Sequence, residues 1–85
     1  MHGIGGNKRN WDDNVPFFAK HFKVIAWDTR GYGLSDDYVG PFKFTDVAND
    51  LLRVIDFFKS DKVHLVGLSM GARIACWFYN QYPKR

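Results

Sequence analysis

The clearest hydrophobic pattern in the chain has the period of an α-helix and lies between residues 46 and 59. The polar residues between the apolar positions fall largely on the opposite face, as in a helix that packs one side against a core. Thr45 provides a hydroxyl that can cap this helix, and Asp46 suits the positive end of the helix dipole. We therefore predict a packing helix from Asp46 to about Lys59, with an apolar face made of Val47, Leu51, Val54, Ile55 and Phe58.

A second apolar stripe with helical spacing precedes it, between Asn10 and about Lys20. Asn10 can cap a helix there, but Pro16 fits only if the helix begins near Val15 or bends at that point. We predict a helix over this range and expect its stripe to face the core. The stripe consists of Trp11, Val15, Phe18 and Phe22.

Two short apolar runs have the composition of buried strands. The first covers residues 22–27, and the second, residues 63–66, leads directly into Gly67-Leu68-Ser69-Met70-Gly71. An apolar segment without proline follows, so we predict a helix that begins after Ser69 and ends at about Tyr82, where Pro83 stops it.

The predicted order is therefore helix, strand, helix, strand, tight turn and helix. Such alternation predicts an α/β fold, in which a parallel sheet has helices on its faces and right-handed crossover connections. Nucleotide-binding folds share this architecture, so the fold class alone does not decide the function.

Composition excludes several classes of protein. The 85 residues are 46% hydrophobic and 18% aromatic, which indicates a folded chain and not a disordered one. The formal net charge is +3, but the basic pairs Lys8-Arg9 and Lys84-Arg85 are too short for a nucleic-acid-binding tail. No apolar run approaches the ~20 residues of a membrane span. We predict no nucleic-acid or membrane partner, and the simplest expectation for the location is the cytoplasm.

The residues that could bind a metal lack the spacing of a metal site. Cys76 lies among apolar residues of the last predicted helix, where we expect a small buried side chain. The three histidines, His2, His21 and His64, form no ligand pair with it or with one another. The sequence therefore predicts neither a metal nor another cofactor.

The segment Gly67-x-Ser69-x-Gly71 joins a predicted strand to a predicted helix. On its own this motif is equally typical of an ordinary glycine-rich turn, but the strand before it and the helix after it favour a catalytic serine. A serine at so tight a turn has a strained backbone, and a Cβ at Gly67 or Gly71 would collide with the neighbouring chain. The helix that follows directs its free N–H groups toward any oxyanion formed at the serine.

Two loops complete the candidate chemistry. The first, residues 2–7, is rich in glycine but matches neither common phosphate-binding motif. The second, residues 28–36, contains Asp28 and Arg30, which could form a local ion pair. Asp28 as a catalytic acid and Ser35 as a nucleophile are less favoured than structural roles, because neither has a base or a sharp strand-to-helix turn around it.

Three segments together resemble the α/β-hydrolase superfamily, and the resemblance covers essentially the whole chain. They are residues 2–7 with Trp11, residues 26–36 and residues 66–75. Within the superfamily the chain is most similar to the branch that acts on small substrates. This branch includes 3-oxoadipate enol-lactonases, carboxylesterases and hydrolases of aromatic meta-cleavage products.

The resemblance implies a role for each matched residue. Ser69 matches the nucleophile, and the backbone N–H groups of Ile4 and Met70 match the two donors of the oxyanion hole. Trp11 and the Met70 side chain are expected near the acyl pocket. The residues expected to support these motifs are His2, Gly3, Gly67 and Gly71.

The chain also departs from the family pattern. In this fold the catalytic acid and histidine follow the nucleophile, yet no Asp, Glu or His follows Ser69. His21 and His64 are not at the family's positions. Met1 matches the last residue of a strand that lies, in the family, between the two strands predicted here. We expect residues 1–85 to be a single incomplete domain, a fragment from the N-terminal half of a hydrolase truncated at both ends and inactive on its own.

The expected function is that of a serine hydrolase that forms an acyl-enzyme on Ser69 and acts on small esters or lactones. One alternative is a non-catalytic binding protein with the same fold. Others use the same residues for cofactor-free perhydrolysis or for carbon–carbon hydrolysis of meta-cleavage products. Dehalogenases and epoxide hydrolases are disfavoured, because those families carry Asp where this chain has Ser69. The substrate and the oligomeric state are left open.

Overall fold

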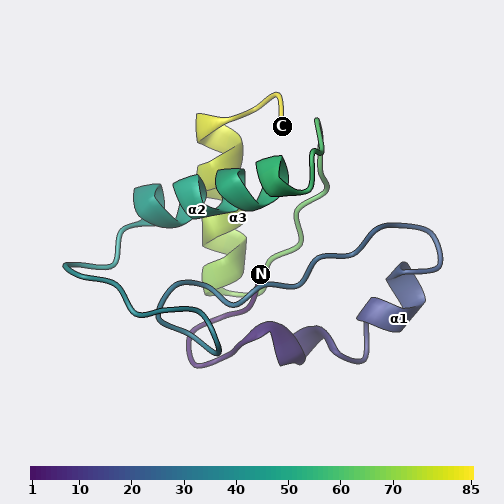
Figure 1. The fold of residues 1–85 in the computed structure, drawn as a ribbon, viewed down its shortest axis with the longest axis horizontal. Helices are drawn as coiled ribbons and strands as arrows, with labels where there is room; N and C mark the ends of the chain where they lie inside the picture. Colours follow the sequence, from purple (N-terminus) through teal and green to yellow (C-terminus); the bar gives the residue numbers. More distant parts are fainter.

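Two helices that cross and pack against each other form the centre of the molecule (Figure 1). The computed structural model describes all residues 1–85. The two central helices are α2, Phe44–Phe57, and α3, Met70–Gln81. Two short helices lie apart from this pair, in the lower half of Figure 1. They are a 3-10 helix, η1, Lys8–Trp11, and a single-turn helix, α1, Val15–Phe18. No helix is both long enough and apolar enough to cross a membrane.

Helix α2 confirms the predicted packing helix but lies two residues earlier along the chain. Its N-cap position is Lys43, which has extended backbone and makes no side-chain cap bond, so the prediction of Thr45 as the cap is wrong. The helix starts at Phe44, two residues before the predicted start, and the Phe44 ring packs there against Phe42 and Trp77. It ends at Phe57 because Lys59 takes a left-handed conformation, with φ of +57°.

The core lies between one face of α2 and one face of α3. Of the predicted apolar face of α2, three residues are buried and the other two are half-buried. The buried apolar residues of the two helices are Val47, Ala48, Leu51, Ile55, Met70, Ile74 and Phe78. Helix α3 ends within one residue of the predicted end. Only 12 of 85 residues are buried, so most of the chain beyond this helix pair is at the surface.

Cys76 is exposed on α3, and the prediction that it is buried is wrong. The face of α3 that contacts α2 repeats every four residues, at Met70, Ile74 and Phe78. Cys76 follows Ile74 by two positions, which places it on the opposite side of the helix.

The predicted helix over residues 10–20 is also wrong in its extent. Asn7 caps η1 and Asn10 is its third residue, which accepts a hydrogen bond from the Asn7 N–H at 2.7 Å. Pro16 lies in the first turn of α1, where its missing N–H costs nothing, and its ring prevents a helix from running through from η1. The expected core stripe is not formed, because Phe18 and Phe22 are exposed.

The two predicted strands are extended but do not form a sheet, so the sheet part of the expected α/β architecture is not seen. A strand requires a partner, and of the strand expected between these two segments the chain contains only Met1, so no backbone hydrogen bond joins residues 22–27 to residues 63–66. The Val63 N–H donates to the Arg85 carbonyl, and Met1 lies beside the end of the second segment. Its amino group donates to the Val66 carbonyl, and its carbonyl accepts from the Leu68 N–H at 3.0 Å. This alternation is the hydrogen-bond pattern of a parallel pair.

Candidate active site

Ser69 occupies a strained turn immediately before α3. Its backbone has φ of +54° and ψ of −111°, a region that residues other than glycine rarely adopt and that costs roughly 1–3 kcal/mol. The turn is closed by the Gly71 N–H, which donates to the Leu68 carbonyl at 2.9 Å. The Ser69 side chain is exposed and accepts or donates no hydrogen bond within the chain. The strain that the motif predicts is therefore present at this residue.

Gly67 and Gly71 are required by close contacts between backbone segments. A Cβ at Gly67 would overlap the Gly71 carbonyl group, and a Cβ at Gly71 would overlap the carbonyl of Met1. Neither neighbour is a flexible side chain that could move aside. The structure thus confirms the steric reason for both glycines.

The glycine-rich loop of residues 2–7 lies directly against this turn. A Cβ at Gly3 would stand 3.2 Å from the Ser69 Cβ and 3.2 Å from the Leu68 carbonyl oxygen. The structure thus brings together two segments from opposite ends of the chain. Ile4 is 80% exposed, Met70 is buried, and the backbone N–H of neither residue donates a hydrogen bond within the chain.

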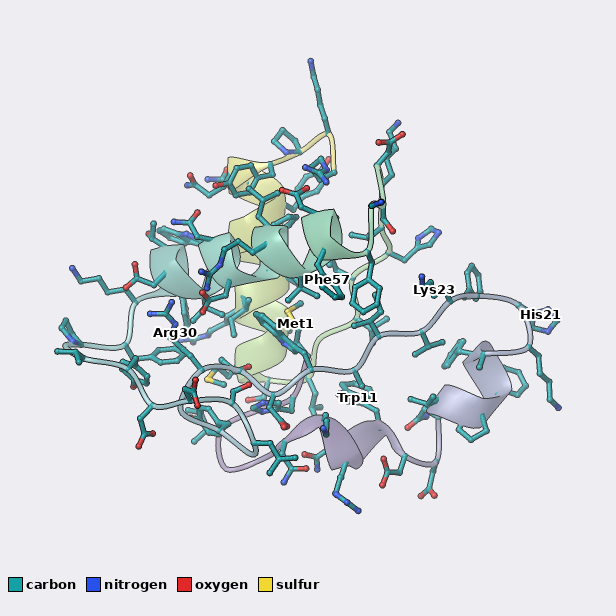
Figure 2. All side chains as sticks on the ribbon, in the orientation of Figure 1. Met1, Trp11, His21, Lys23, Arg30 and Phe57 are labelled. Carbon is teal, nitrogen blue, oxygen red and sulfur yellow. The ribbon has the colours of Figure 1, made fainter.

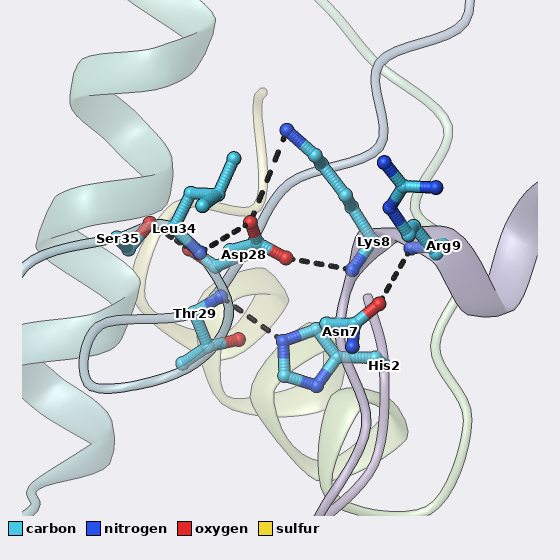
Figure 3. A network of polar contacts seen from close by, with 8 residues as sticks. All are labelled: His2, Asn7, Lys8, Arg9, Asp28, Thr29, Leu34 and Ser35. Carbon is cyan, nitrogen blue, oxygen red and sulfur yellow. Dashed lines mark hydrogen bonds and ion pairs between the residues drawn. The ribbon is translucent and has the colours of Figure 1, made fainter.

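The His2 imidazole is fully buried and uses both of its nitrogens. Figure 3 shows one of these contacts, the bond with Thr29. Nε2 accepts a hydrogen bond from the Thr29 N–H at 3.0 Å, so the ring proton belongs on Nδ1, which donates to the Gly3 carbonyl at 2.9 Å. With both nitrogens occupied, His2 cannot take a proton from Ser69. It instead connects the loop of residues 2–7 to the loop of residues 28–36.

Asp28 strengthens that connection but does not pair with Arg30, so the predicted local ion pair is wrong. Its buried carboxylate accepts from the Lys8 N–H at 2.7 Å and from the Leu34 N–H at 3.0 Å (Figure 3). The Ser35 hydroxyl donates to the Asp28 carbonyl oxygen at 2.6 Å. Burial disfavours the charge, but these two N–H donors and the nearby Lys8 ammonium outweigh it, so the pKa of Asp28 lies below its usual value.

Arg30 pairs with Asp50 of α2. The guanidinium donates to both carboxylate oxygens, at 2.6 and 2.8 Å, and Arg53 adds a third contact at 2.6 Å. Burial raises the pKa of Asp50, but the hydrogen bonds and positive charge of the two arginines lower it more, and the net shift is downward. This ion pair fastens the loop of residues 28–36 to the central helices.

None of the three residues Trp11, His64 and His21 forms a hydrogen bond with Ser69. Trp11 is half-buried, and its indole N–H is buried without a hydrogen-bond partner. His64 is exposed and contacts the Phe22 ring, with centroids 5.8 Å apart. Figure 2 shows His21 at the outer end of the molecule, far from Met1, which marks the position of the serine turn.

The sequence motifs do not single out one residue of the site, Tyr32. Tyr32 lies in the loop of residues 28–36, its ring packs on His2, and its hydroxyl contacts the Met70 sulfur. The only hint in the sequence is an aromatic residue between Gly31 and Gly33, which marks a tight bend but not the direction of the side chain.

The family of the chain is given by a match over its whole length. The sequence model of the α/β hydrolase fold matches residues 1–85, and the chain belongs to this family. The resemblance drawn from the three motif segments is thus confirmed.

Individual relatives are named as several kinds of enzyme. The chain is similar to 3-oxoadipate enol-lactonase 2 of Acinetobacter baylyi, with 29% identity over 84 residues, 99% of this chain and 32% of the lactonase. It is also similar to a probable alcohol acetyltransferase of Wickerhamomyces anomalus, with 32% identity over 85 residues, 98% of this chain and 25% of that protein. Among solved structures it is similar to a marine microorganism esterase, with a TM-score of 0.94 and 28% identity over 99% of this chain and 32% of the esterase. The chain therefore spans about a quarter to a third of the length of these relatives.

Proposed function

We propose that the protein is a serine hydrolase that cleaves small esters or lactones, with Ser69 as the nucleophile. The observation that carries the proposal is the packing of Gly3 against Ser69, which leaves two unpaired backbone N–H groups, those of Ile4 and Met70, on the segments that flank an exposed, strained serine. Such preorganised donors stabilise an oxyanion without reorganising during the reaction. The names of the lactonase and esterase relatives support the substrate class.

The proposed reaction has two halves. A general base takes the proton of the Ser69 hydroxyl as the oxygen attacks the ester carbonyl carbon, and the resulting oxyanion accepts hydrogen bonds from Ile4 and Met70. The ester C–O bond then breaks, the leaving alkoxide takes the proton, and the acyl group stays on Ser69. Water attacks this acyl-enzyme through a second oxyanion, the carboxylic acid departs, and the proton returns to Ser69.

The general base comes, in this proposal, from a part of the protein outside residues 1–85. His2 is excluded because both of its nitrogens are engaged, and His21 lies at the outer end of the molecule. The proposed domain is likewise larger than this chain, which covers 32% of the enol-lactonase. Trp11 is assigned to the acyl side of the site, on the strength of its match to the family motif.

The test is ester turnover by the complete reading frame that encodes this chain. We expect hydrolysis of short p-nitrophenyl esters by the wild type and a loss of at least about 10³-fold in Ser69→Ala. Ser35→Ala is the matched control, because the Ser35 hydroxyl is bonded to the Asp28 carbonyl and has no part in the chemistry. A folded wild type without turnover, or equal losses in the two variants, would contradict the proposal and favour a binding role for the fold.

A further inference from the structure

The two proposed oxyanion donors lie on different segments. Met1 bonds to Val66 and Leu68 and Gly3 packs against Ser69, but no hydrogen bond joins Ile4 to Met70 themselves. Ile4 belongs to the loop of residues 2–7, and Met70 begins α3. An oxyanion needs both N–H groups within hydrogen-bond distance of one point, so something must fix the separation of the two segments. The inference drawn here rests on the proposed function of this site.

Tyr32 contacts both segments with one side chain. Its ring centroid lies 5.0 Å from that of the buried His2 imidazole, at an interplanar angle of 60°. Its hydroxyl lies 3.9 Å from the Met70 sulfur, and its ring packs against the core cluster that contains Met70 and Ile74.

The position of the His2 ring determines the direction of the Ile4 N–H. His2 Nδ1 donates to the Gly3 carbonyl, which also accepts from the Gly6 N–H at 3.0 Å. The Gly3 carbonyl and the Ile4 N–H belong to one planar trans peptide, so they point in opposite directions. A shift of the imidazole therefore turns the Ile4 donor.

The backbone of Tyr32 is held by Thr29, which is also bonded to His2. Its N–H donates to the Thr29 carbonyl at 2.8 Å, while the Thr29 N–H donates to His2 Nε2. Gly33, with φ of +51°, allows the bend beside it, and a Cβ there would overlap the Asp28 carboxylate. The tyrosine thus stands on a rigid turn, with its ring between the imidazole and the start of α3.

We propose that Tyr32 is a positioning residue that sets the spacing between the Ile4 and Met70 donors by filling the space between His2 and Met70. It touches no reacting atom and acts through the two segments that carry the donors. Removing the ring takes away the side chain that packs between His2 and Met70. A misplacement of about 1 Å in such a site can cost roughly 100-fold in rate.

The test compares Tyr32→Phe and Tyr32→Leu in the complete reading frame with p-nitrophenyl esters. Tyr32→Phe keeps the ring and is expected to retain kcat within about 5-fold, whereas Tyr32→Leu is expected to lose about 10- to 100-fold in kcat. Both halves of the reaction pass through an oxyanion, so acylation and deacylation slow together and KM changes by less than about 3-fold. Rates are normalised to the sites that a fluorophosphonate labels at completion, which removes any effect of unfolded protein.

Tyr82 is the matched control. Its hydroxyl donates to the Asn49 side chain at 2.8 Å and joins the far end of α3 to α2. Tyr82→Phe and Tyr82→Leu are expected to change thermal stability but not kcat per labelled site. An unchanged kcat in Tyr32→Leu, or a KM effect alone, overturns the inference. A wild type that neither labels nor turns over esters overturns the proposed function instead.

Discussion

Gly71 shows how one missing methyl group permits the geometry at Ser69. Inside an ordinary helix, replacing glycine by alanine stabilises by roughly 0.5–1 kcal/mol. At this position a Cβ would overlap backbone atoms of Met1, and it would lie 2.9 Å from the His2 carbonyl oxygen. The collision reverses the sign of the substitution, because backbone cannot move aside as the end of a side chain can.

We therefore expect Gly71→Ala to lower the free energy of unfolding by about 1–3 kcal/mol, the usual range for overpacking. Chemical denaturation of the complete reading frame measures this change. Gly40→Ala is the comparison for strain without a collision: φ of +90° strains an alanine there, but nothing lies within 4 Å of its added Cβ, so its loss of stability reports backbone strain alone. A stabilised Gly71→Ala variant would show that the turn relaxes freely and that the close approach is unimportant.

The buried carboxylate of Asp28 leads to a second prediction, on how stability depends on pH. Its pKa is lowered in the folded protein, so folding favours the carboxylate, and the stabilisation is complete above its unfolded pKa of about 4. This stabilisation is lost as the pH falls through the lower pKa of the folded state. Asp28→Asn cannot titrate. The difference in melting temperature between wild type and Asp28→Asn should therefore shrink between about pH 6 and about pH 3. A difference that stays constant over that range would contradict the assignment.

At the scale of elements, α2 ends through backbone hydrogen bonds and not through a side-chain cap. The Lys59 N–H donates to the Asp56 carbonyl at 3.0 Å, and the Ser60 N–H donates to the Ile55 carbonyl at 3.2 Å. This pair of bonds is a Schellman motif, which requires a left-handed residue at position 59. Glycine is the residue that adopts this conformation without a steric cost.

Lys59→Gly should accordingly raise the free energy of unfolding by about 0.5–1 kcal/mol, after the entropy that glycine adds to the unfolded chain is subtracted. Lys62→Gly serves as the control, because residue 62 has no positive φ and gains only that unfavourable entropy. Destabilisation of Lys59→Gly equal to that of Lys62→Gly would show that the left-handed conformation stores no strain.

The sequence predicts those parts of the structure that depend on neighbours within one helix or one turn. The existence and apolar face of α2 follow from periodicity, and α3 follows from an apolar segment without proline between Ser69 and Pro83. The need for glycine at positions 67 and 71 follows from the steric demands of the Ser69 turn. The partner of Arg30 and the exposure of Cys76 depend on tertiary contacts, and the predictions for both are wrong. Pro16 predicts that a helix starts or bends near Val15, but it does not predict the separate 3-10 helix η1 that precedes α1.

In the whole molecule, the candidate active-site residues lie at the N-terminal end of α3. The loop of residues 2–7 lies against the Ser69 turn, the loop of residues 28–36 is joined to it through His2 and Asp28, and Asp50 fastens that second loop to α2. α1 lies away from this region (Figure 1). Large apolar side chains on the extended segments, Ile25, Val66 and Leu68, remain exposed among residues 1–85. Tests of activity therefore use the complete reading frame.

Ser69 is proposed to be an activated nucleophile, so it should form a covalent adduct with a fluorophosphonate. The complete reading frame is treated with this reagent, digested and analysed by tandem mass spectrometry. We predict one phosphonate on Ser69, none on Ser35 or Ser60, and no labelling of Ser69→Ala or of heat-unfolded protein. A folded protein that stays unmodified, or that is modified only at another serine, would contradict it.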